Sequence, residues 1–214
     1  MANKETLKDA LQLFKLSAPK KMPGFTMALT ACTSCPTGSK LRAIKGSVCE
    51  NCYACKGFYR MGPAKKTRLF NDNAVAQGNG WAKELVQFLL ATKQPEFRFH
   101  DSGDITSMAH LEAIVGVANS VPTCKFWVPT KEYRIVREYL KANGSFPINM
   151  CVRISAPMVG KTISESAACG LPTSSVNCES AFHCPVKNGK EGCDTYNCRA
   201  CWNRDTKNVN YHKH

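Results

Sequence analysis

The chain has 214 residues, of which 13 are cysteine, and a formal net charge of +13 at pH 7. A chain of this length with 43% hydrophobic residues can bury a core without cross-links, so the cysteines are not required as disulfide staples. Charged residues interrupt positions 1–16, which excludes a signal-peptide core, and no apolar run is long enough to span a bilayer. We therefore expect a soluble cytoplasmic protein with reduced thiols and no membrane partner.

The first part of the chain combines one short helix with a long irregular segment. Residues 4–16 place Leu7, Leu11 and Phe14 at helical spacing, which predicts a short amphipathic helix that docks on the core. Residues 19–56 are rich in Gly, Pro, Thr, Ser and Cys and show no sustained period. We expect this second region to be a loop that metal ligation organises.

The middle of the chain alternates between predicted helices and strands. A helix is expected at 71–92, and the pattern then runs strand 96–100, helix 107–120, strand 124–129, helix 132–142 and strand 148–155. This order is typical of parallel βαβ units with right-handed crossovers. Because a complete eight-fold barrel needs about 250 residues, we predict an α/β fold whose parallel sheet is a partial or open (β/α) barrel.

Cysteine-rich, loop-dominated segments flank this predicted core on both sides. After residue 160 the regular pattern fades, and residues 169–202 are again dominated by Cys, Gly, Pro and Asn. We expect a single domain over 1–214, made of a helix and cysteine-rich loop in 1–70, a βαβ core in 71–160 and a cysteine-rich segment in 161–214.

Polar residues follow the first predicted strand of the core. Ligands gather at the carboxyl ends of parallel strands, so His100 and Asp101 are candidates for an acid–base pair. The alternative is a strand-end histidine with satisfied hydrogen bonds followed by an aspartate that caps a turn. Cys124 and Cys151 fall inside predicted strands, and we interpret both as core residues.

Four cysteines near the C-terminus lie within eighteen residues of one another in the string CPVKNGKEGCDTYNCRACW. Their spacing is Cys184-x8-Cys193-x4-Cys198-x2-Cys201. Four thiolates in so short a span can close on one zinc ion or on one iron–sulfur cluster. The spacing predicts metal ligation, although only the last pair has the CxxC form that zinc ribbons use twice.

A second set of cysteines lies in the string ACTSCPTGSKLRAIKGSVCENCYAC. It contains Cys32, Cys35, Cys49, Cys52 and Cys55. The first four form two CxxC pairs at a spacing that suits a zinc ribbon. The ending Cys-Tyr-Ala-Cys instead is similar to the cluster loop of radical S-adenosylmethionine enzymes, in which an aromatic residue follows the middle cysteine.

Several unusual strings resemble the bacteriophage "gene product 88" family in the same order along most of the chain. They are LSAPKKMPGFTMAL, GSVCENCYACKG, FRFHDSGDI, KFWVPTKEY, VRISAP and CPVKNGKEGCDTYNCRACW. The resemblance implies a phage origin, a place in the host cytoplasm and cysteine-bound metal. It assigns the recurring cysteines to Cys35, Cys49, Cys52, Cys184, Cys193, Cys198 and Cys201, and leaves Cys32 and Cys55 as extras.

A looser resemblance links residues 46–54 and the following βαβ units to radical S-adenosylmethionine and spore-photoproduct-lyase-like proteins. It implies a cluster of the 4Fe–4S type and S-adenosylmethionine as a further cofactor. In that family an acidic, glycine-containing motif after the first strand holds the methionyl amine, a part that Ser102, Gly103 and Asp104 would play here. The alternative for these three residues is a plain turn that caps a helix.

The basic balance adds a second class of function. A charge of +13 suits a polyanionic partner, although the chain contains no recognisable nucleic-acid module. We predict an iron–sulfur protein on a partial barrel, and whether it is a radical-type enzyme stays open. The alternative is a zinc-stabilised basic module that binds nucleic acid or a host protein.

Overall fold

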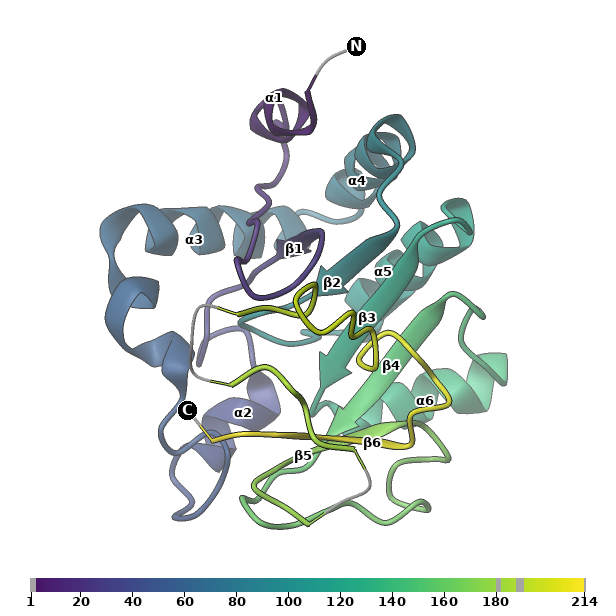
Figure 1. The fold of residues 1–214 in the computed structure, drawn as a ribbon. Helices are drawn as coiled ribbons and strands as arrows, with labels where there is room; N and C mark the ends of the chain where they lie inside the picture. The colour runs from purple at the N-terminus through teal and green to yellow at the C-terminus, as the bar shows by residue number, and fades with distance from the viewer. Residues whose placement is uncertain (1–2, 180–181, 188–190, 214) are drawn as a thin grey trace.

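The chain folds around a single parallel β-sheet (Figure 1). The computed structural model describes residues 3–179, 182–187 and 191–213, so 180–181, 188–190 and 214 of the predicted segment 161–214 lie outside it. Six strands run in the order β1-β2-β3-β4-β5-β6, namely β1 Phe25–Met27, β2 Glu96–Phe99, β3 Lys125–Thr130, β4 Met150–Ser155, β5 Thr173–Val176 and β6 Asn208–Tyr211. Neighbours in sequence are neighbours in the sheet, as in a barrel that has not closed, and this confirms the predicted fold class.

Helices cover one face of this sheet, and the C-terminal segment crosses the other (Figure 1). The elements are α1 Lys4–Asp9, α2 Pro36–Leu41, the 3-10 turns η1 Tyr53–Cys55 and η2 Gly57–Arg60, α3 Gly62–Ala76, α4 Gly80–Thr92, α5 Met108–Ser120 and α6 Tyr133–Asn143. Within the described residues, none of these helices is long and apolar enough to cross a membrane.

The strands are buried on both faces, for different reasons. On the helix-covered face the side chains are apolar, and Phe97, Phe99 and Phe126 are fully buried. The opposite face, which we call the inner face, carries Arg98 of β2 and Arg153 of β4. Each arginine alternates along its strand with apolar residues of the helix-covered face. An all-parallel sheet of this kind requires a cover on each side, and the C-terminal segment supplies it on the inner face.

Arg153 attaches the C-terminal segment to the inner face. Its guanidinium is fully buried and donates hydrogen bonds to four main-chain carbonyls at 2.8–3.0 Å. These carbonyls belong to Thr173, Ala200, Asn203 and Thr206. A single strand residue therefore links β4 to β5 and to the loop that precedes β6.

Three strands and several helix boundaries differ from the prediction. The expected helix 4–16 ends at Asp9, and α2 lies inside the region expected to be loop. The expected helix 71–92 is two helices, because the chain turns at Gly78, whose φ of +107° favours glycine. The short strand β1 lies inside the region expected to be loop, and β5 and β6 lie in the region where regular structure was expected to fade. The last two strands are polar and are stabilised across the sheet by side-chain hydrogen bonds, for example from Ser175 Oγ to Asn208 Oδ1 at 2.9 Å.

Candidate functional site

The segment Thr30–Cys55, which we call the cysteine loop, lies across the carboxyl ends of the strands. It leaves β1 next to the turn that follows β2, where Leu29 N donates to Ser102 O at 2.9 Å and Ser102 Oγ donates to Leu29 O at 2.7 Å. Further along, Val48 N donates to Pro157 O at 2.9 Å, just beyond β4. Figure 1 shows α2, which is part of this loop, at the end to which the strand arrowheads point.

A buried carboxylate after β3 fixes the part of the loop that contains α2. Glu132 Oε1 accepts a hydrogen bond from Thr37 N at 2.8 Å, and Glu132 Oε2 accepts one from Thr37 Oγ1 at 2.9 Å. These contacts hold the first turn of α2, and with it Cys35, against the β3–α6 connection. The loop is thus tied to the ends of β2, β3 and β4 by the chain's own polar groups.

Beneath the loop is a cavity of about 330 Å³ whose lining includes Cys32, Cys35, Cys49 and Cys52. A Cβ built at Gly38 would lie 3.6 Å from Cys49 Sγ and 3.8 Å from Cys35 Sγ. The two sulfur atoms therefore face the same small space, which the missing side chain of Gly38 leaves open. The donor set is one that soft metals prefer, so its chemistry and placement fit a thiolate-bound metal group.

The Cys35 and Cys49 thiols are protonated at pH 7 in the metal-free protein. Burial raises the pKa of Cys35 to about 12 and also raises the pKa of Cys49, although the nearby Lys131 charge opposes the shift at Cys49. Among the described residues, no group of three or more His, Cys, Asp or Glu side chains is arranged to hold a metal ion. Metal ligation would thus require the thiols to lose their protons. It would also require the loop to bring their sulfur atoms closer together, so that metal binding and local folding are coupled.

Cys32 and Cys55 form a further pair at the edge of the loop. Arg42 Nη1 donates to Cys32 Sγ at 2.9 Å and to Cys55 Sγ at 3.4 Å. Burial, together with the nearby Cys32 and Cys52 thiols, raises the pKa of Cys55 to about 12. The structure thus brings all five cysteines of the N-terminal set into one neighbourhood.

The turn Ser102-Gly103-Asp104 lies between the cysteine loop and β3 and lines the same cavity. Gly103 has a φ of +81°, and a Cβ there would lie 2.4 Å from Leu29 Cβ, so only glycine fits. Asp104 accepts hydrogen bonds from Thr130 Oγ1 (2.6 Å), Ile105 N (2.8 Å) and Lys131 N (2.9 Å). Burial raises the pKa of Asp104 to about 6.

His100 and Asp101 also line the cavity, and their side chains have different neighbours. His100 has a φ of +64°, and its buried ring lies 5.1 Å from that of His110 between centroids. Burial lowers the pKa of His100 well below its usual value, so the ring is neutral at pH 7. Asp101 Oδ2 accepts a hydrogen bond from the Tyr59 hydroxyl at 3.2 Å. An acid–base role for the two residues stays a prediction.

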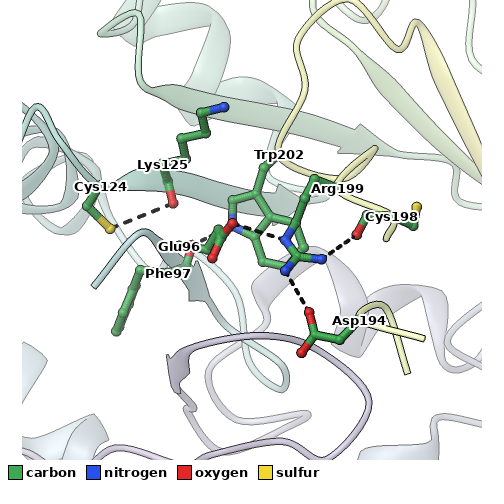
Figure 2. Close-up of polar contacts among 8 residues, drawn as sticks. All are labelled: Glu96, Phe97, Cys124, Lys125, Asp194, Cys198, Arg199 and Trp202. Carbon is green, nitrogen blue, oxygen red and sulfur yellow. Dashed lines mark hydrogen bonds and ion pairs between the residues drawn. The ribbon is translucent and has the colours of Figure 1, made fainter. Parts of the chain in front are cut away.

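The part of the C-terminal segment that contains Cys198, Arg199 and Trp202 lies beside the start of β2 (Figure 2). Trp202 Nε1 donates to Phe97 O at 3.0 Å, and Arg199 bridges Glu96 Oε1 at 3.0 Å and Asp194 Oδ1 at 2.6 Å. Cys198 lies next to Arg199 in the same view. The segment that carries the quartet is therefore fixed to the first residues of the strand.

The four C-terminal thiols are neighbours of one another. Burial, together with the neighbouring Cys184 and Cys198 thiols, raises the pKa of Cys193 to about 11. Burial also raises the pKa of Cys201 to about 12, while its contact with the Tyr211 hydroxyl, at 3.0 Å, lowers it. Cys198 thus lies next to Arg199 at the first residue of β2, whereas Cys184 and Cys201 contact the last residues of β6, through Asn210 O and the Tyr211 hydroxyl.

Sequence reasoning missed two charged residues of this region that the structure makes prominent. Arg98 lies on the inner face and lines the cavity, and Glu132 fixes α2. The sequence did contain a signal for Arg98. It is a charged residue between Phe97 and Phe99 in a predicted strand of a parallel sheet, where both faces are normally buried. Conversely, Arg68 is buried, with its guanidinium carbon 4.3 Å from the centroid of the Tyr59 ring, so it adds little to the basic surface that the net charge of +13 suggests.

No curated protein and no solved structure matches this chain. One family model, described as gene product 88, matches residues 1–163. The matched part contains the cysteine loop, β1 to β4 and the turn after β2, and it ends before the C-terminal cysteines. Since it covers 163 of the 214 residues, the chain belongs to the gene product 88 family.

Proposed function

We propose that the protein binds an iron–sulfur cluster through Cys35, Cys49 and Cys52 at the carboxyl ends of the sheet. The observation that carries this proposal is the convergence of the Cys35 and Cys49 sulfur atoms on the space beside Gly38, in a cavity that Cys52 also lines. Parallel α/β sheets place their ligands at this edge.

The donor set favours a cluster over a single zinc ion. Four ligands of one zinc ion lie about 2.3 Å from a common centre, whereas the thiolates of a cluster bind different iron atoms and can lie further apart. Three cysteines would leave one iron of a 4Fe–4S cluster without a protein thiolate. Such a cluster would supply electron transfer, and its open iron would accept an exogenous ligand.

S-adenosylmethionine is the exogenous ligand that the turn after β2 would suit. Ser102 and Gly103 bring the main chain to the cavity, and Asp104 lies within it. The Asp104 carboxylate has about four acceptor positions, and the protein uses three of them. One position therefore remains for the ammonium group of such a ligand.

The test is the metal content and visible spectrum of the anaerobically purified protein. We expect a brown protein that contains iron and acid-labile sulfide. The triple variant Cys35→Ser, Cys49→Ser, Cys52→Ser should lose both, because it removes every proposed ligand. Cys169→Ser, a thiol outside both cysteine sets, serves as the matched control and should retain them.

Two outcomes would contradict the proposal. A colourless wild-type protein that contains zinc would favour the zinc-stabilised module that binds nucleic acid or a host protein. Equal iron in the triple variant and in Cys169→Ser would place the cluster elsewhere. The open iron position is tested separately by adding S-adenosylmethionine to the reduced, iron-loaded protein and measuring its cleavage. Cleavage requires both the cluster and the ligand site, so Asp104→Ala should reduce it.

A further inference from the structure

The floor of the cavity contains a buried arginine, Arg98, that forms no ion pair within the described residues. Arg98 lies on the inner face of β2, in register with Trp127 of β3, and its guanidinium carbon is 4.3 Å from the centroid of the Trp127 ring. This stacking fixes the plane of the guanidinium. Both residues line the cavity.

Arg98 lacks the partners that a buried guanidinium usually has. In the part of the chain that the structure describes, no carboxylate forms an ion pair with it. Its Nε has no hydrogen-bond partner among the described residues, Nη1 lies 3.6 Å from the Met22 sulfur, a weak acceptor, and the Tyr53 hydroxyl is a further hydrogen-bond neighbour of the guanidinium. Arg153, on the same face, also has an Nε without a partner in the described chain but donates to four carbonyls. The guanidinium with few acceptors is therefore the one that lines the cavity.

Other groups of the cavity do not make up for the missing acceptor. Trp127 Nε1 is a second buried donor without a partner among the described residues. Lys131 and Lys213 add further cations to the lining. Of the two carboxylates that line the cavity, Asp104 accepts three hydrogen bonds from the protein, and Asp101 accepts one from Tyr59 on Oδ2 while its Oδ1 is buried without a partner in the described part of the chain. The Asp101 charge stabilises Arg98, but the lining, as far as the structure describes it, still carries three cationic side chains, Arg98, Lys131 and Lys213, against two carboxylates.

We infer that this floor binds the oxyanion of a small ligand, a carboxylate or a phosphate, with the Arg98 guanidinium as its counter-ion and the Trp127 ring as the group that positions it. Leaving a buried charge unpaired is costly, and a ligand oxyanion removes that cost. A planar guanidinium suits either oxyanion, because both accept two parallel hydrogen bonds. The inference goes beyond the proposed cluster, since none of its residues is a cysteine.

The experiment titrates the purified protein, with the metal content it carries, with inorganic phosphate and separately with succinate. Sodium chloride at matched ionic strength corrects for screening. Melting temperature and calorimetric heat are the readouts, so a failure of the cluster proposal, which appears in the visible spectrum, does not affect the result. We expect a saturable rise in melting temperature with at least one oxyanion, and the oxyanion that causes it identifies the ligand class.

Variants assign the effect to Arg98. Arg98→Gln should weaken binding by about tenfold or more. Arg134→Gln, which removes the same charge from a side chain that is 90% exposed on α6, should bind as the wild type does. Trp127→Leu should weaken binding less than Arg98→Gln, and Trp127→Phe, which keeps a ring under the guanidinium, should retain most of it.

Three results would overturn the inference. The first is that neither oxyanion has a saturable effect on melting temperature beyond that of chloride. The second is equal oxyanion affinity in Arg98→Gln and Arg134→Gln, and the third is wild-type affinity in Trp127→Leu. If Arg98→Gln does not fold, Arg98→Lys replaces it, because it keeps the charge and loses the planar fork. Weaker binding in Arg98→Lys than in Arg134→Gln then supports the site, and equal binding excludes it.

Discussion

Burial decides the chemical state of individual thiols in this protein. The pKa of Cys35 and that of Cys201 are both raised to about 12, because burial disfavours the charged thiolate. Metal ligands must be thiolates, so binding has to release these protons, and metal affinity should increase with pH. The same burial makes the free Cys35 and Cys201 thiols weak nucleophiles.

The C-terminal quartet provides the residue-scale prediction. Replacing both Cys198 and Cys201 by Ser should lower the bound metal and the melting temperature together, because segments without a core of their own are stabilised by ligation. Metal analysis and thermal unfolding are the measurements. The matched control is the double variant Cys169→Ser, Cys178→Ser, which removes two thiols outside the quartet. If both double variants have the metal content and melting temperature of the wild type, the quartet is not a metal site.

At the scale of elements, the turn after β2 determines where the cysteine loop lies. The turn and the residue after β1 exchange two hydrogen bonds, and Gly103 allows their main chains to approach closely. Asp104 and Glu132 then connect the same region to the end of β3. The loop thus takes its position from strand ends and not from a core of its own.

Gly103→Ala should destabilise the protein by about 2–4 kcal/mol, because the new Cβ meets Leu29 and because alanine disfavours a positive φ. Gly116→Ala is the control. Gly116 lies in α5 with nothing within 4 Å of a new Cβ, so that change should stabilise by about 0.5–1 kcal/mol. Urea unfolding of both variants measures the difference. An equal effect of the two changes would show that the close approach to Leu29 does not hold the loop.

At the scale of the whole molecule, one sheet separates an apolar layer from a polar one. Helices bury aromatic and aliphatic side chains on the outer face, whereas the inner face is covered by a segment with little regular structure. Because this segment has few main-chain hydrogen bonds from regular structure, Arg153 holds it in place by donating hydrogen bonds to four main-chain carbonyls. Trp202 and Arg199 attach the same segment to β2 (Figure 2).

Arg153→Met should therefore release the C-terminal segment and cost at least about 3 kcal/mol of stability, since four carbonyls lose their donor. Limited proteolysis should then cut within residues 178–206 faster than in the wild type. Arg204→Met is the control, because that arginine is exposed in the same segment. The role assigned to Arg153 is wrong if the two variants unfold and are cleaved alike.

The sequence by itself determined the alternation of strands and helices between residues 96 and 155 and the two cysteine sets, because these depend on local periodicity and spacing. It did not reveal β5 and β6, whose polar residues become strands only through partners across the sheet such as Ser175 and Asn208. It also could not distinguish Arg98 from Arg153, each a single charge within an apolar strand. The tertiary structure decided that difference, because carbonyls from residues far along the chain reach Arg153, whereas Arg98 faces a cavity.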